Sequence, residues 1–249
     1  MDGLLGQSDG LIRLSIFAGV FLLMAAIELI RPKRRLSVSK ARRWLTNLGI
    51  AGVDTLVLRL MAALAVPVAA VAAAFFAQEH KLGLLNQVDW PYWLNLVIAL
   101  LVLDLAIWAQ HLEGATVEIA LSMLWKIAVV IPLGAAPFAV FLFEVILNAC
   151  AMFNHANIAL APWLDRALCL FIVTPDMHRV HHSVLYSEHD RNYGFNLSLW
   201  DRLFGTYLAQ PKAGHQGMTL GLPDYQSEAP TRFGWSLLLP FGQQKRQRS

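Results

Sequence analysis

The stretch LIRLSIFAGVFLLMAAIELI, residues 11–30, is apolar along almost its whole length. Its charged side chains are Arg13 near the start and Glu28 near the end. A helix needs about 20 mostly apolar residues to cross a bilayer, and this stretch has that length. Arg31 and Pro32 follow directly, and no small-residue cleavage site of a signal peptide is present. We therefore expect residues 11–30 to form a retained membrane-spanning helix.

The composition of the whole chain supports a membrane protein. Of the 249 residues, 57% are hydrophobic and only 15% are charged, and the mean hydropathy is +0.50. An average soluble domain has about 25% charged residues, so a soluble fold and a disordered chain are both excluded. Two cysteines in apolar surroundings do not make a disulfide framework. The net charge of +3 is too small to indicate nucleic-acid binding.

Two further stretches are long and apolar enough to cross the bilayer. Residues 45–76 can span it with tilt, and Pro67 predicts a kink within them. Residues 91–111 begin among Trp90, Tyr92 and Trp93, which are typical of the membrane–water interface. We expect each stretch to form a spanning helix.

A fourth apolar region is interrupted. Residues 119–131 and residues 137–152 are each shorter than a span, and Pro132-Leu133-Gly134 separates them. The pattern predicts a re-entrant helical hairpin that enters and leaves by one face. The alternative is one long, kinked span.

Charge predicts the orientation. The segment from Arg31 to Arg43 carries seven basic side chains and no acidic one, whereas residues 78–90 are nearly balanced. The positive-inside rule places residues 31–43 in the cytoplasm, and the later crossings return the chain to that face. The expected fold class is all-α and multi-pass, with three spanning helices and the hairpin in residues 1–152. Residues 153–249 would form a cytoplasmic helical cap, at the inner membrane if the source is bacterial.

Residues 177–182, MHRVHH, are the sharpest local signal for chemistry. On a helix, side chains three and four positions apart share a face, so His178 meets both His181 and His182. Neutral imidazoles in this arrangement suit iron, copper or zinc. The alternative is a surface helix that happens to be rich in histidine.

A polar stripe precedes these histidines. Glu144, Asn148 and His155 recur at offsets of four and seven along an apolar helix. Polar groups at that depth usually face a bundle interior or a cavity. We expect His155 to be a metal ligand, with Glu144 and Asn148 either supporting the site or forming a network that holds helices together.

The third predicted span ends in another histidine. His111 shares a helix face with Asp104, which lies two turns away, about 10 Å along the axis. Asp104 cannot touch His111 at that distance. It could orient another ligand, or it could pair with Arg59 in a structural role.

Four segments carry a resemblance to a known family. TPDMHRVHHS at 174–183 and NYGFNLSLWDRLFGTY at 192–207 resemble the C-terminal half of the bacterial sterol desaturase and fatty acid hydroxylase superfamily. RRWLTNL at 42–48 and FNHAN at 153–157 are similar to it as well. The resemblance implies an integral membrane enzyme in which clustered histidines hold two non-haem irons. Such enzymes use dioxygen to hydroxylate or desaturate a lipid.

The resemblance also implies roles for individual residues. His178, His181 and His182 would be the family's last group of iron-binding histidines, called a histidine box. His155 would be the isolated ligand before that box, and His111 the first histidine of the first box. Residues 192–207 would close over the site at the membrane surface.

The chain departs from the family pattern after His111. The family has a further histidine one turn later and then a His-x-x-His-His box, but here the chain continues directly to Ile119. The first two boxes are therefore largely missing, and Glu113 or Glu118 could substitute as carboxylate ligands.

Three functions remain open at this point. The first is a lipid oxygenase that receives electrons from a separate donor protein, since no flavin, haem or dinucleotide signature is present. The second is a catalytically inactive homologue that binds a metal or a lipid as a membrane scaffold. The third is a hydrolase with one zinc ion on His178, His181 and His182.

Overall fold

The computed structural model describes residues 9–35, 39–63, 70–112 and 119–239. Across these ranges the regular elements are helices, and no β-strand is formed. The same ranges contain three isolated antiparallel β-bridges. The expected all-α fold is therefore confirmed.

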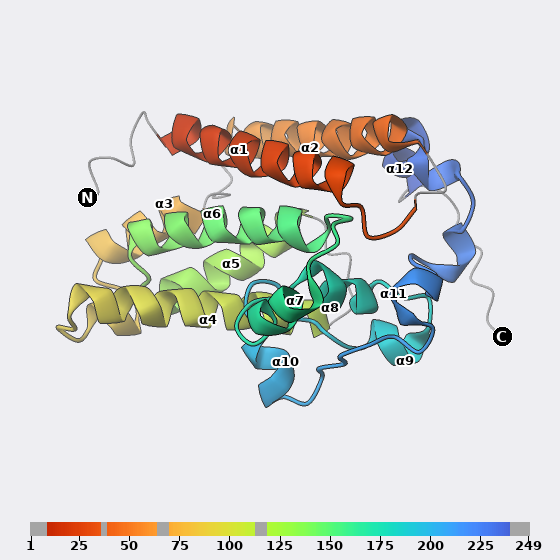
Figure 1. The fold of residues 1–249 in the computed structure, drawn as a ribbon. Helices are drawn as coiled ribbons and strands as arrows, with labels where there is room; N and C mark the ends of the chain where they lie inside the picture. Colours follow the sequence, from red (N-terminus) through yellow and green to blue (C-terminus); the bar gives the residue numbers. More distant parts are fainter. Residues whose placement is uncertain (1–8, 36–38, 64–69, 113–118, 240–249) are drawn as a thin grey trace.

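Six helices make up the N-terminal part of the chain, and five of them are long. They are α1 (Asp9–Ile30), α2 (Lys40–Ala63), α3 (Ala70–Glu79), α4 (Tyr92–Leu112), α5 (Ile119–Leu133) and α6 (Pro137–Asn154). Figure 1 shows α1 and α2 side by side along one edge of this group, with α6 next to α1.

Short helices make up the rest. They are α7 (Pro162–Leu168), α8 (Pro175–His181), α9 (Tyr186–His189), α10 (Leu199–Leu203), α11 (Gly214–Gly217) and α12 (Phe233–Leu238), with 3-10 turns η2 (Leu84–Asn86), η3 (Pro223–Tyr225) and η4 (Ala229–Thr231). Helices α7 to α11 gather at one end of the long helices (Figure 1).

Three helices in the described ranges are long and apolar enough to cross a membrane: Gly10–Ile30, Tyr92–Leu112 and Pro137–Asn154. The first and second were expected. The third arises because α6 continues two residues beyond the predicted helix, to Asn154, which gives it the length of a candidate span; the re-entrant hairpin stays a prediction. The expected span over residues 45–76 is not among the three. Its residues belong to α2 and α3, and residues 64–69 between them, with Pro67, lie outside the described part.

The chain turns within the predicted break, although α5 ends two residues later than predicted, at Leu133. Pro132 lies inside α5, and the turn comes at Gly134, whose φ of +72° is a left-handed conformation. Gly83, with φ +88°, lies against this turn so closely that a Cβ on it would be 2.2 Å from the Gly134 nitrogen. Helices α5 and α6 each pack against both α3 and α4.

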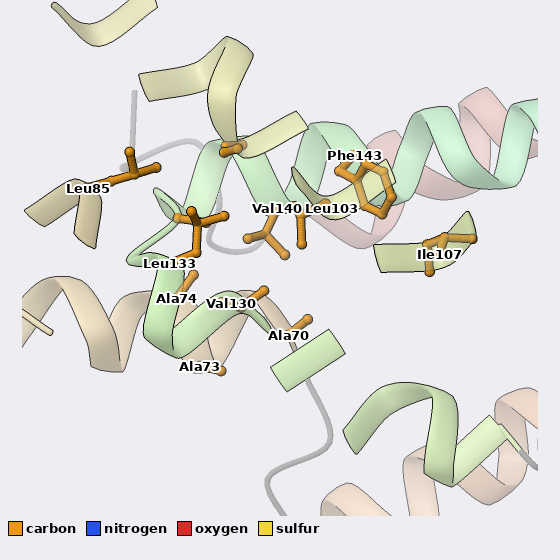
Figure 2. Close-up of a cluster of buried hydrophobic side chains, with 13 residues drawn as sticks. Ala70, Ala73, Ala74, Leu85, Leu103, Ile107, Val130, Leu133, Val140 and Phe143 are labelled. Atoms are coloured by element: carbon orange, nitrogen blue, oxygen red, sulfur yellow. The ribbon is translucent and has the colours of Figure 1, made fainter. Parts of the chain in front are cut away.

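Small side chains on α3 form the centre of the hydrophobic core. Ala70, Ala73 and Ala74 are buried, which lets α5 and α6 approach the α3 backbone closely. Figure 2 shows these alanines together with larger side chains from α4 and α6, such as Leu103 and Phe143. The core therefore fixes α4 and α6 relative to each other.

An ionic cluster joins three of these helices. Glu144 of α6 accepts a hydrogen bond from Arg13 of α1 at 2.8 Å, and Lys126 of α5 lies 3.6 Å from its other oxygen. Both cations are partly covered by protein. This contact is of the kind expected for a network that holds helices together, and a supporting role for Glu144 at the metal site stays a prediction.

The region after α6 is tied back to the N-terminal helices at two places. Pro32 pairs with Ile158 in an antiparallel bridge, and Lys33 N donates to Asn157 O at 3.0 Å. On the other side, Trp108 of α4 donates to Asp201 of α10 at 3.1 Å. The end of α6 packs against the histidine-bearing helix α8, and Lys33, just after α1, pairs with Asp176 of α8.

Candidate metal centre

Helix α8 carries the MHRVHH sequence, and its start is fixed by local chemistry. Thr174 caps the helix by accepting a hydrogen bond from Met177 N at 3.3 Å, and Pro175 occupies the first helical position. This start places His178 and His182 four positions apart on one face. Their Nε2 atoms are 3.1 Å apart.

His155, at the C-terminal end of α6, completes a triad. Its Nε2 lies 3.1 Å from that of His178 and 3.3 Å from that of His182. Its Nδ1 donates to Ala151 O at 2.8 Å. Because a carbonyl can only accept, this bond places the proton on Nδ1 and leaves the Nε2 lone pair directed at the other two rings.

Three ring nitrogens that face one another cannot all form hydrogen bonds with one another. A nitrogen of a neutral imidazole either donates or accepts, so among three at least two have the same role. At least one of the three contacts is then not a hydrogen bond. A cation bound by all three lone pairs removes this conflict.

The spacing of the triad also fits a metal ion. Metal–nitrogen bonds of about 2.0–2.1 Å at ordinary coordination angles separate neighbouring nitrogens by about 2.9–3.4 Å. The separations of 3.1–3.3 Å in the triad lie in this range. In the described part of the chain, His155, His178 and His182 are the group close enough to share one ion.

Burial favours the neutral, metal-binding form of the central ligand. His178 is 2% exposed. This burial, together with the neighbouring rings of His182 and His155, holds the pKa of His178 well below its ordinary value. The ring is thus ready to bind a cation without first losing a proton.

The other two expected ligands, His111 and His181, lie beside the triad rather than in it. His111 has its ring 5.9 Å from that of His181, and the Nδ1 of His181 donates to Arg191 O at 3.1 Å. Both rings line a second cavity of about 570 Å³, into which His182 also opens. Glu113 and Glu118, the possible substitutes, lie outside the described residues.

His189 joins this second group, and the sequence did not single it out. Its ring is stacked on that of His181, 5.6 Å away, and it lines the same cavity. Its position seven residues after His182 follows no metal-binding spacing, so only the fold could bring it to the site.

Phe195 contacts histidines of both groups. Its ring is stacked on His111 at 5.2 Å and meets His178 edge-on at 6.1 Å. Its carbonyl accepts a hydrogen bond from Asn154 at 2.6 Å, which holds the 192–207 segment against the end of α6.

The three polar residues expected near the ligands have other partners, and those of Glu144 are Arg13 and Lys126. The other two are Asp104 and Asn148. Asp104 accepts hydrogen bonds from Trp200 Nε1 at 2.8 Å and from Leu197 N at 3.2 Å. Asn148 donates to the carbonyl of Glu144, one turn earlier. Among the described residues neither hydrogen-bonds a histidine. The alternative partner of Asp104, Arg59, has a side chain outside the described part.

Comparison with known proteins finds similarity to lipid and fatty acid hydroxylases over part of the chain. Residues 105–206 match the family model described as fatty acid hydroxylase, and this range holds the triad and His111. The chain is also 38% identical over 78 residues to the ornithine lipid hydroxylase OlsE of Rhizobium tropici. That match covers 31% of this chain and 23% of the relative. No solved structure matches the chain.

Proposed function

We propose that this chain is an iron-dependent membrane hydroxylase or desaturase acting on a lipid, because residues 105–206 match the fatty acid hydroxylase domain model. The observation that carries the proposal is the His155, His178 and His182 triad, whose Nε2 atoms converge within 3.3 Å inside that domain. The apolar helices α1, α4 and α6 support a membrane-bound substrate.

The residues present fit iron, since imidazole is a good ligand for it. Bound iron would activate dioxygen, so that one oxygen atom enters a C–H bond of the lipid and the other leaves as water, with two electrons and two protons taken up. The chain's own contribution is to hold the ligands. Ala151 O orients His155, the α8 helix sets His178 against His182, and Phe195 covers one side of the rings.

The electrons would come from a separate donor protein. The basic segment from Arg31 to Arg43 supports an orientation in which α8 and the C-terminal region face the cytoplasm, where such donors are found. In a bacterium this would be the inner membrane.

A second candidate is a catalytically inactive homologue that binds one metal ion or a lipid. It is favoured by one observation: the described residues place three histidines within reach of a single ion, whereas the family binds two irons.

Elemental analysis of the detergent-purified protein tests both proposals. We expect iron, with lipids from expressing cells that gain an oxygen atom or lose two hydrogens. Two irons per chain would mean that other groups complete a second site. One ion with unchanged lipids would favour the scaffold, and one zinc would favour hydrolysis. Protein without metal would contradict both metal-dependent functions.

A further inference from the structure

A large cavity lies directly beside the triad and is lined by cations. Its volume is about 670 Å³, and His155 and His182 form part of its wall. Four guanidinium side chains also line it, namely those of Arg34, Arg35, Arg43 and Arg179.

Arg179 is compensated by protein, because it donates to Asp176 at 2.5 Å. Arg34 is not. Its Nη2 donates to Met218 O at 2.6 Å, whereas its Nη1 is buried and has no hydrogen-bond partner. A buried donor without a partner is costly, so this nitrogen points to an acceptor that a ligand would bring.

The backbone of Arg34 is held in place. Its N–H donates to Asn157 Oδ1 at 3.0 Å, and Asn157 Nδ2 donates to its carbonyl at 2.8 Å. Burial and the nearby Arg179 both lower the pKa of Arg34, as expected where positive charge is crowded. Arg35 and Arg43 form no ion pair within the described ranges. The cavity therefore has three cations available for an anion.

A smaller, apolar cavity adjoins the cationic one. It has a volume of about 230 Å³ and lies among α1, α2 and α6, with Phe17, Phe21 and Trp44 in its wall. The carboxylate of Glu28 also lines it, and Lys40 lies 3.9 Å from that group. Arg43, His155 and Ala156 line both cavities.

We infer that the two cavities together bind an anionic lipid, with its phosphate or carboxylate headgroup on Arg34, Arg35 and Arg43 and its acyl chain among α1, α2 and α6. His155 then lies where headgroup and chain meet. The position of oxidation rests on the proposed function. If that function holds, the oxidised carbon lies near the headgroup end of the lipid rather than at its tail.

Binding can be measured on metal-free protein, so its outcome does not depend on oxidation. Purified protein in a neutral detergent is titrated with phosphatidylglycerol, oleate and phosphatidylcholine of matched chain length, by native mass spectrometry. We expect the two anionic lipids to bind about tenfold or more tightly than phosphatidylcholine, as for a charge-assisted contact. A preference for phosphatidylglycerol over oleate assigns a phosphate headgroup, and the reverse assigns a carboxylate.

Neighbouring arginines provide the matched control. Arg43→Gln should weaken phosphatidylglycerol binding about tenfold. Arg42→Gln removes the same charge, but Arg42 pairs with Glu228 at 3.5 Å and does not line the cavity, so binding should be unchanged. Equal loss in both variants would mean general attraction to the basic surface and would overturn the site.

The acyl half is tested separately. Phe21→Trp narrows the apolar cavity, so it should weaken phosphatidylglycerol but leave the binding of inorganic phosphate unchanged. Inorganic phosphate that binds as tightly as the lipid would identify a free-anion site and overturn the lipid assignment. Equal binding of anionic and zwitterionic lipids would overturn the headgroup assignment, whatever the enzyme's activity.

Discussion

Trp108 of α4 and Asp201 of α10 are joined by a buried hydrogen bond of 3.1 Å between the indole Nε1 and a carboxylate oxygen. The same carboxylate accepts hydrogen bonds from Tyr193 N at 2.9 Å, Gly194 N at 2.7 Å and Thr206 Oγ1 at 2.6 Å. Asp201 thus joins both ends of the 192–207 segment to each other and connects the segment to α4, the helix that carries His111. This fully buried carboxylate acts together with Asn154 and Asp104, which also hydrogen-bond the segment that was expected to cover the site.

Asp201→Asn should destabilise the protein by about 1–3 kcal/mol, because the amide group that replaces Oδ2 would face the N–H of Gly194 and leave it unpaired. The measurement is the thermal unfolding midpoint in detergent. Asp224→Asn, at an exposed position in η3, is the control and should leave the midpoint unchanged. An equal midpoint in all three proteins would show that the segment is held by other contacts.

The sequence predicts two of the three candidate spans because apolar length is a property of composition alone. The predicted span over residues 45–76 stays a prediction, because residues 64–69 lie outside the described part. The end of α6 was placed two residues too early, because the end of a helix depends on its neighbours. Asn154 is polar, yet it stays helical and donates to Phe195 O.

In the candidate site, too, local spacing along one helix is predictable from the sequence, whereas contacts between helices are not. Helical spacing alone brings His178 to His182, and so this pair is predictable. That His155 joins them depends on α6 and α8 packing together. The polar stripe ending at His155 predicted it as a ligand, but helical spacing could not show which histidines it would meet. His181 has the right spacing but turns to Arg191 O and the second cavity. The cationic cavity was not predicted, because Arg34 and Arg179 are distant in sequence.

Glu144→Gln separates a structural role from a role at the metal. The substitution leaves Arg13 and Lys126 without their carboxylate in a partly buried site, which should cost about 3–5 kcal/mol. We expect a lower unfolding midpoint with unchanged iron per folded chain. Glu79→Gln, at the exposed end of α3, should change neither. Loss of iron at an unchanged midpoint would instead assign Glu144 to the metal site.

Gly134→Ala tests the turn between α5 and α6. The left-handed backbone alone costs about 1–2 kcal/mol with a side chain. The new Cβ would also lie 2.8 Å from Leu82 O, which is backbone and cannot move aside easily. We expect a clearly lower unfolding midpoint. Gly19→Ala, inside α1 with open space around it, should not lower it. An unchanged unfolding midpoint in Gly134→Ala would contradict the close approach of the turn at Gly134 to the backbone of Leu82 and Gly83.

His155→Ala tests the triad, and the chain contains a close control. His80 also follows a helix and donates from Nδ1 to the carbonyl four residues earlier, Phe76 O, at 2.9 Å. It has no histidine partner in the described ranges. We expect His155→Ala to lower iron per chain at least tenfold, because two imidazoles remain where three converged, whereas His80→Ala should keep full iron content.

A ligand that binds only the folded state stabilises it, so added ferrous iron should raise the unfolding midpoint of the wild type and of His80→Ala. It should have little effect on His155→Ala. This second readout matters because a lower iron content could also come from a misfolded variant. If His155→Ala folds, retains iron and is still stabilised by it, then the ion is bound elsewhere, and the cavity lined by His111, His181 and His189 becomes the site to test.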